Sequence, residues 1–76
     1  MHTKNVVLQL KAIGFDPITW DESDGSIDLS ELVSVRVPSV SGGLVICKAT
    51  DDGKFSMSKP YKDLMSLRHA LISALA

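Results

Sequence analysis

The sequence has one cysteine, few aromatic residues and no long hydrophobic run, and these deficits exclude several classes of protein. The lone Cys47 cannot form an intramolecular disulfide, which excludes a disulfide-stapled secreted scaffold and favours a reducing compartment. No apolar stretch approaches the roughly 20 residues that a membrane-spanning helix needs. Residues 1–14 also lack the uninterrupted apolar core and cleavage site of a signal peptide. We therefore expect a cytoplasmic protein that does not enter a membrane.

Signatures of catalysis and of cofactor binding are also missing. His2 and His69 are far apart in the chain, and neither has a second His or Cys at metal-ligand spacing. Gly42 and Gly43 lack the lysine and the following helix of a phosphate-binding loop. We also expect a chain of 76 residues to be too short to enclose a substrate pocket of about 300 Å³ or more. We expect no catalytic residue, no metal, no cofactor and no enzymatic activity.

The charges that are present are distributed unevenly, although the net charge is only -1. Residues 16–31 carry six acidic side chains and no Lys or Arg. Residues 32–76 carry six basic and three acidic side chains. This asymmetry predicts one acidic surface and one weakly basic surface, which bears on the choice of partner rather than on the fold.

The hydrophobic pattern predicts a single α+β domain over residues 1–76. Apolar residues recur at helical spacing between Thr3 and Gly14, where a left-handed glycine should end the first helix. A second helix is expected from about Lys59 to Leu75, with Pro60 in its first turn. The segments between them alternate as strands do, over residues 18–22, 27–29, 32–37 and 43–50.

These elements predict a two-layer sandwich. The antiparallel sheet should have three or four strands, and both helices should pack on one of its faces. Residues 54–58 fit either a short edge strand or an irregular lead-in to the second helix. Cys47 alternates with Val45 and Ala49, which predicts that these three side chains lie on the core side of their strand.

The acidic stretch 20–31 has two interpretations. With Gly25 at the sharp turn, its acidic and hydroxyl side chains resemble the ligand pattern of an EF-hand calcium loop. Trp20 would occupy the first ligand position without an oxygen to offer, and neither flank has a helical pattern. The alternative, which we favour, is a β-hairpin with a type I′ turn at Asp24-Gly25. Trp20 and Ile27 would then face the core, and the acidic side chains would form a negative rim.

Two features suggest contact with another protein. The acidic rim would attract a partner with a basic surface. Leu8 lies off the apolar stripe of the first helix, and Arg68 lies among the apolar residues of the second. Alternatively, the guanidinium of Arg68 reaches solvent or pairs with a carboxylate of the acidic segment. The candidate contact residues are Asp21, Glu22, Asp24, Asp28, Glu31, Arg68 and Leu8.

The leading hypothesis is therefore a small non-catalytic protein–protein interaction module, such as an adaptor, a regulator or an inhibitor. It would act as a monomer or as a homodimer, in which the amphipathic second helix pairs across a two-fold axis. Two further hypotheses are a nucleic-acid-binding domain and a degenerate calcium loop at residues 20–31.

The nucleic-acid hypothesis rests on the basic start of the second helix. The candidate residues for binding an anion or a nucleic acid are Lys54, Lys59, Lys62 and Arg68. The stretch SMSKPYK, and the order helix, strands, helix, are similar to those of double-stranded-RNA-binding domains. That resemblance implies that Lys59 and Lys62 contact phosphates. The first loop between strands, which enters the minor groove in that family, is acidic here and would be repelled by phosphate.

Overall fold

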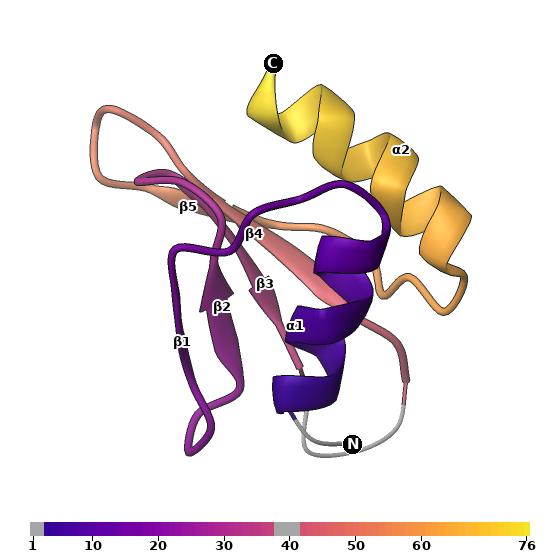
Figure 1. Cartoon of the computed structure of the whole chain (residues 1–76). Helices are drawn as coiled ribbons and strands as arrows, with labels where there is room; N and C mark the ends of the chain where they lie inside the picture. The colour runs from indigo at the N-terminus through magenta and orange to yellow at the C-terminus, as the bar shows by residue number, and fades with distance from the viewer. Residues whose placement is uncertain (1–2, 38–41) are drawn as a thin grey trace.

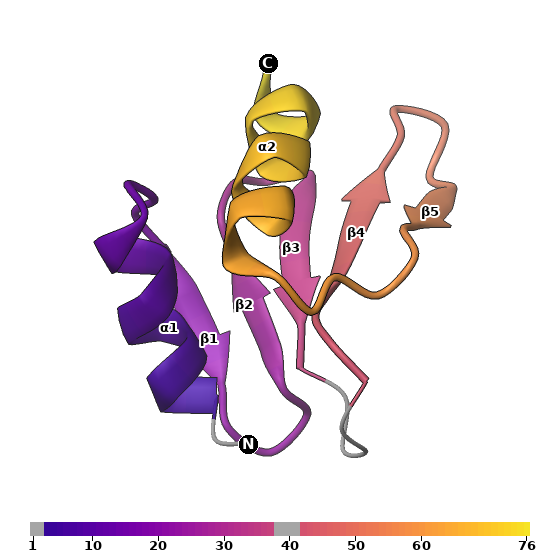
Figure 2. The same cartoon turned by 90° about the vertical axis from the view of Figure 1, so that its right-hand side faces the viewer.

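A computed structural model describes residues 3–37 and 42–76. It shows a five-stranded antiparallel sheet with both helices on one face (Figures 1 and 2). The elements are α1 (Thr3–Ala12), β1 (Thr19–Asp21), β2 (Ser26–Asp28), β3 (Val33–Arg36), β4 (Val45–Ala49), β5 (Phe55–Met57) and α2 (Leu64–Leu75). The strand order is β1-β2-β3-β4-β5, so each strand pairs with the next one in the chain. The predicted α+β two-layer fold is confirmed, with five strands rather than three or four.

The fifth strand forms because residues 54–58 pair with β4. Ser56 lies opposite Lys48, and hydrogen bonds extend the ladder beyond the strand at both ends. The Thr50 N–H donates to the carbonyl of Lys54 at 2.8 Å, and the Ser58 N–H donates to the carbonyl of Ile46 at 2.9 Å. The open question about this segment is thereby settled in favour of a short edge strand.

Helix α1 forms and ends as its sequence predicts. Val6, Val7 and Leu10 are buried against the sheet. Gly14 adopts a φ of 103°, and the N–H of Phe15 donates to the carbonyl of Leu10 at 3.0 Å. This bond, together with one from the Gly14 N–H to the carbonyl of Lys11, is the Schellman arrangement that satisfies the last carbonyls of a helix.

The core lies between the two helices and one face of the sheet. Ile27 is opposite Val35, and Val35 is opposite Ile46, so one row of side chains crosses three strands. Leu67 and Leu71 of α2 complete the same buried cluster.

The side of β4 that faces this core differs from the prediction. Because side chains alternate along a strand, Val45, Cys47 and Ala49 face away from the helices when Leu44 and Ile46 are buried. Cys47 is half-buried on this opposite face.

Helix α2 begins at Leu64, later than the predicted start at Lys59. The segment before it is extended, because the N–H and carbonyl of Tyr61 both hydrogen-bond to Leu44 at 2.8 Å. Asp63 is the N-cap residue of the helix and accepts a hydrogen bond from the N–H of Ser66. Pro60 therefore lies in a connection beside β4 and not in the first helical turn.

The acidic stretch forms a hairpin, as the favoured interpretation predicts, but its turn differs. Asp21 pairs with Ser26, which leaves a four-residue loop over 22–25 instead of a two-residue turn. Gly25 has a φ of 72°, and it alone in this loop has a positive φ. A type I′ turn would need a positive φ at Asp24 as well. The Gly25 N–H donates instead to the carbonyl of Asp21 at 3.0 Å.

Trp20 is not part of the core. It lies opposite Ile27, on the helix-covered face, but β1 is the edge strand of the sheet. Its side chain is 43% exposed, whereas that of Ile27 is fully buried. The Nζ of Lys11 lies 5.8 Å from the centre of the Trp20 ring, within the range of a cation–π contact.

Candidate functional site

The acidic side chains of the hairpin are exposed and make local hydrogen bonds. Asp21 Oδ1 accepts hydrogen bonds from the N–H and hydroxyl of Ser23, and these bonds lower the pKa of the Asp21 carboxyl. Glu22 Oε1 accepts the N–H of Lys4, at 2.9 Å, in the first turn of α1. These two carboxylates therefore stabilise the hairpin and its contact with α1.

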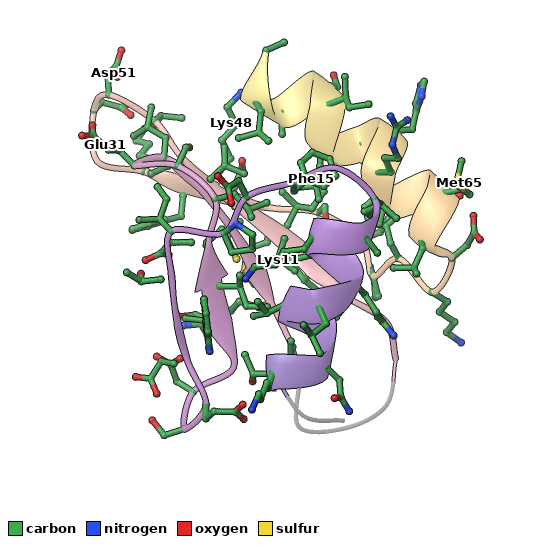
Figure 3. All side chains as sticks on the ribbon, in the orientation of Figure 1. Lys11, Phe15, Glu31, Lys48, Asp51 and Met65 are labelled. Carbon is green, nitrogen blue, oxygen red and sulfur yellow. The ribbon has the colours of Figure 1, made fainter. Side chains whose placement is uncertain are left out.

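The acidic residues do not form one continuous rim. In an antiparallel meander, successive turns lie at opposite ends of the sheet. The β1–β2 loop with Asp21, Glu22 and Asp24 lies at one end (Figure 1), and Glu31 and Asp51 lie at the other end (Figure 3). The predicted rim is thus two separate acidic clusters, each smaller than the sequence suggests.

Arg68 ties the two helices together. Its side chain is exposed, and Nε donates to the carbonyl of Ile13 at 3.1 Å. Ile13 follows the last residue of α1, where a cation also complements the negative end of the helix dipole. The hydrogen-bond partner of Arg68 is thus a carbonyl and not a carboxylate of the acidic segment. Leu8 is exposed on the outer side of α1, as predicted.

The four predicted anion-binding residues are not brought together. Lys59 lines a groove beside β5, whereas Lys62 lines a different and smaller cavity with Gln9. Lys54 lies at the β4–β5 turn, and Arg68 contacts the end of α1. The start of α2 is also occupied by the Asp63 carboxylate, which accepts the hydrogen bonds that an anion would accept there.

The Asp63 cap predicts a pH dependence of stability. The backbone N–H of Ser66, and then its hydroxyl, hold the pKa of Asp63 below its usual value of 3.8. A carboxyl whose pKa is lowered by folding stabilises the protein at pH values above its unfolded pKa. That stability is lost as the pH falls through the folded pKa. The contribution of Asp63 should therefore be complete at neutral pH and decline below about pH 4.

Asp63→Ala is expected to lower the melting temperature by several degrees at neutral pH, because alanine cannot accept the Ser66 N–H. Asp63→Asn is the matched control, since asparagine caps a helix but does not titrate. Thermal melts from neutral to acidic pH should show a shallower acid-side loss for Asp63→Asn than for the wild type. Identical acid-side slopes would mean that this cap does not titrate with folding.

Within residues 3–37 and 42–76, no three His, Cys, Asp or Glu side chains are grouped so as to hold a metal ion. Neither of the two described helices has the length and apolar character needed to cross a membrane. The flanks of the acidic loop are strands and not the helices of an EF-hand.

Strand β5 carries two large apolar side chains that are both exposed. Phe55 is 78% exposed and Met57 is 64% exposed. Both face away from the helices, where they lie opposite Ala49 and Cys47 of β4. Phe55 and Met57 therefore extend a row of half-buried apolar side chains to the edge of the sheet; we call these two residues the β5 patch.

A groove separates β5 from α2 on the other face of the sheet. It has a volume of about 940 Å³ and is open to solvent. This volume exceeds the pocket size expected for so short a chain, although the groove is not enclosed. Lys48 and Lys59 line it, and His69 lines it from α2. Lys48 lies toward the C-terminal end of α2 and Met65 toward its start (Figure 3).

No family model, curated protein or solved structure matches this chain. The candidate site is therefore defined by its own geometry: the β5 patch on the open face, and the groove between β5 and α2, which Met57 also borders.

The sequence reasoning did not identify Phe55, Met57, Lys48 or Met65 as site residues. Two features of the sequence pointed to Phe55 and Met57. These residues alternate with serines, as the residues of a strand do, and two helices are too few to cover a sheet that includes a fifth strand.

Proposed function

We propose that this protein is a small non-catalytic protein–protein interaction module. The observation that carries the proposal is the exposure of Phe55 and Met57 side by side on an edge strand. Contiguous exposed apolar side chains mark interaction surfaces, and aromatic residues and Met are enriched at the centres of interfaces. Burying this patch against a partner would remove apolar surface from water, which is the main favourable term in protein association.

The acidic hairpin is a second candidate contact, suited to a partner with a basic surface. Asp21, Glu22 and Asp24 are exposed at the end of the sheet from which β2 starts. If this cluster steers a partner, association should slow as salt rises, because exposed charges are screened. The local hydrogen bonds of Asp21 and Glu22 leave them less free to pair with a partner, so we place the main contact on β5.

Nucleic-acid binding is the less favoured function. It is supported by Lys48 and Lys59 in the groove beside β5. The dispersion of Lys54, Lys62 and Arg68 and the capped start of α2 weigh against it. Two clustered lysines would neutralise few phosphates, whereas tight non-specific binding needs several such contacts.

We also propose that the protein works in the cytoplasm as a monomer or a homodimer. The cytoplasm is supported by the single thiol, Cys47. A chain with one cysteine cannot form an intramolecular disulfide, and proteins without disulfides are typical of reducing compartments. Self-association is supported by Met65 and Ile72 of α2, which are exposed and leave apolar surface beside the buried face of the helix.

The proposal is tested by affinity capture from the native host, with nuclease treatment and mass spectrometry. Wild-type protein is expected to retain specific proteins that the double variant Phe55→Ser, Met57→Ser loses. Leu8→Ser is the matched control, because Leu8 is also exposed but lies on the outer side of α1. Equal capture by all three forms would contradict the proposal. Retention of nucleic acid that falls steeply with salt would favour the alternative function.

A further inference from the structure

The outer edge of β5 offers free backbone hydrogen-bonding groups. In an antiparallel pair, residues alternate between positions bonded to the neighbouring strand and positions that point away from it. The inward bonds of Lys54 and Ser58 to β4 show that the residues between them at odd positions, Phe55 and Met57, point outward. Within residues 3–37 and 42–76, no strand pairs with this edge. The N–H and carbonyl groups of Phe55 and Met57 are thus free to bond an added strand.

An added strand would place its side chains in two different environments. Successive side chains of a strand point to opposite faces. One set would lie beside Phe55 and Met57 on the open face of the sheet, and the other set would enter the groove of about 940 Å³ between β5 and α2. Figure 2 shows β5 to one side of α2, with no helix over it.

The groove selects the chemistry of that second set. Lys48 and Lys59 line it, and none of the described residues that line it carries a carboxylate. Lys54 precedes the strand, but Asp51 and Asp52 lie in the same turn and offset its charge. The positive charge of this site is therefore that of Lys48 and Lys59. Acidic side chains are therefore complementary to the groove, whereas apolar side chains are complementary to the β5 patch.

We infer that β5 accepts an extended segment of a partner protein as a sixth strand, with acidic side chains toward the groove and apolar side chains toward Phe55 and Met57. The inference rests on the proposed function and specifies its partner. Binding by strand addition gains affinity from main-chain hydrogen bonds and specificity from the pockets that receive alternate side chains.

The charges favour this occupant over a second copy of the chain. Two β5 strands paired antiparallel across a two-fold axis at Ser56 would bring Lys54 of one copy close to Lys59 of the other, and the reverse. Like charges in close positions on paired strands are destabilising. An acidic segment from another protein avoids this repulsion between lysines and meets like charge only at Asp51 and Asp52 of the β4–β5 turn.

The test uses a terminally blocked synthetic peptide of alternating Val and Glu, with a peptide of alternating Val and Lys as the control. Binding to the full chain is followed at low salt through the amide NMR signals. The acidic peptide is expected to shift the signals of Phe55 and Met57 and to protect their N–H groups from exchange. Binding of neither peptide, or of both equally, would overturn the inference.

Two substitutions at Met57 separate backbone from side-chain contributions. Met57→Pro removes an outward N–H without removing a bond to β4, so the fold should persist. It is expected to weaken binding by about tenfold or more, because the added strand loses one main-chain hydrogen bond that also fixes its register against β5. Met57→Ala keeps the N–H and should weaken binding less. Equal affinities for the two folded variants would exclude strand addition.

Charge reversal provides the second readout. The double variant Lys48→Glu, Lys59→Glu is expected to lose the acidic peptide and to gain the basic one. Sedimentation that shows a dimer disrupted by Met57→Pro would assign the edge to a second copy and overturn the inference. A natural partner that is lost on substituting the β5 patch, yet is retained by Met57→Pro, would keep the proposed function and reject only the strand-addition mode.

Discussion

Gly25→Ala is expected to lower the free energy of unfolding by about 4 kcal/mol or more, an exceptional loss for one methyl group. Gly25 has a φ of 72°, which disfavours any residue with a Cβ. A Cβ built there would also lie 2.4 Å from the carbonyl oxygen of Val37. The carbonyl of Gly25 accepts the Val37 N–H at 2.7 Å, so the two backbones cannot separate without losing that bond.

Gly53→Ala is the matched control for this effect. Gly53 has a similar φ of 81°, but a Cβ there would meet no described atom within 4 Å. It should therefore show only the backbone cost, about 1–2 kcal/mol. Urea denaturation of the two variants separates the clash from the strain. Equal losses would show that the close approach to Val37 is relieved at no cost.

Leu71→Ala is expected to cost about 3 kcal/mol, because it opens a cavity at the centre of the core. The Leu71 side chain is completely buried between the sheet and the rest of α2. The whole domain is stabilised by roughly 0.05–0.15 kcal/mol per residue. A loss of this size would therefore leave a large unfolded fraction at moderate temperature.

Ile72→Ala, one residue along the same helix, provides the control. Ile72 is 48% exposed, so its truncation removes less buried surface and should cost under about 1 kcal/mol. Both substitutions change a helix residue to alanine, which has a higher helix propensity than either. Equal shifts of the urea midpoint would show that α2 does not pack through the Leu71 face.

The face of α2 that packs on the sheet is predicted only in part by the sequence pattern. The helical period correctly predicts that α2 is amphipathic and that Leu67 and Leu71 are buried. The same period also places Arg68, Met65 and Ile72 on the apolar face, whereas all three side chains are exposed. Ala70 and Ala74 pack on the core as well, which rotates the buried face away from Arg68.

Strand β4 shows a limit that has a different origin. Leu44 and Ile46 are apolar, and so are Val45 and Cys47, so period-two alternation cannot say which set faces the helices. The choice depends on pairing with β3, which is a long-range property. The candidate site could not be predicted for the same reason. The exposure of Phe55 depends on the width of the sheet and on the position of α2, which are also long-range properties.

The sequential pairing of all five strands also has a consequence for the route by which the chain folds. Every strand meets its chain neighbour, so loop closure for the sheet is short-range and the entropy cost of each step is small. Such topologies of local contacts fold quickly for their size. The hydrogen bond from Arg68 to Ile13 joins residues 55 positions apart. We expect that closure of the helical layer, rather than assembly of the sheet, is the late step in folding.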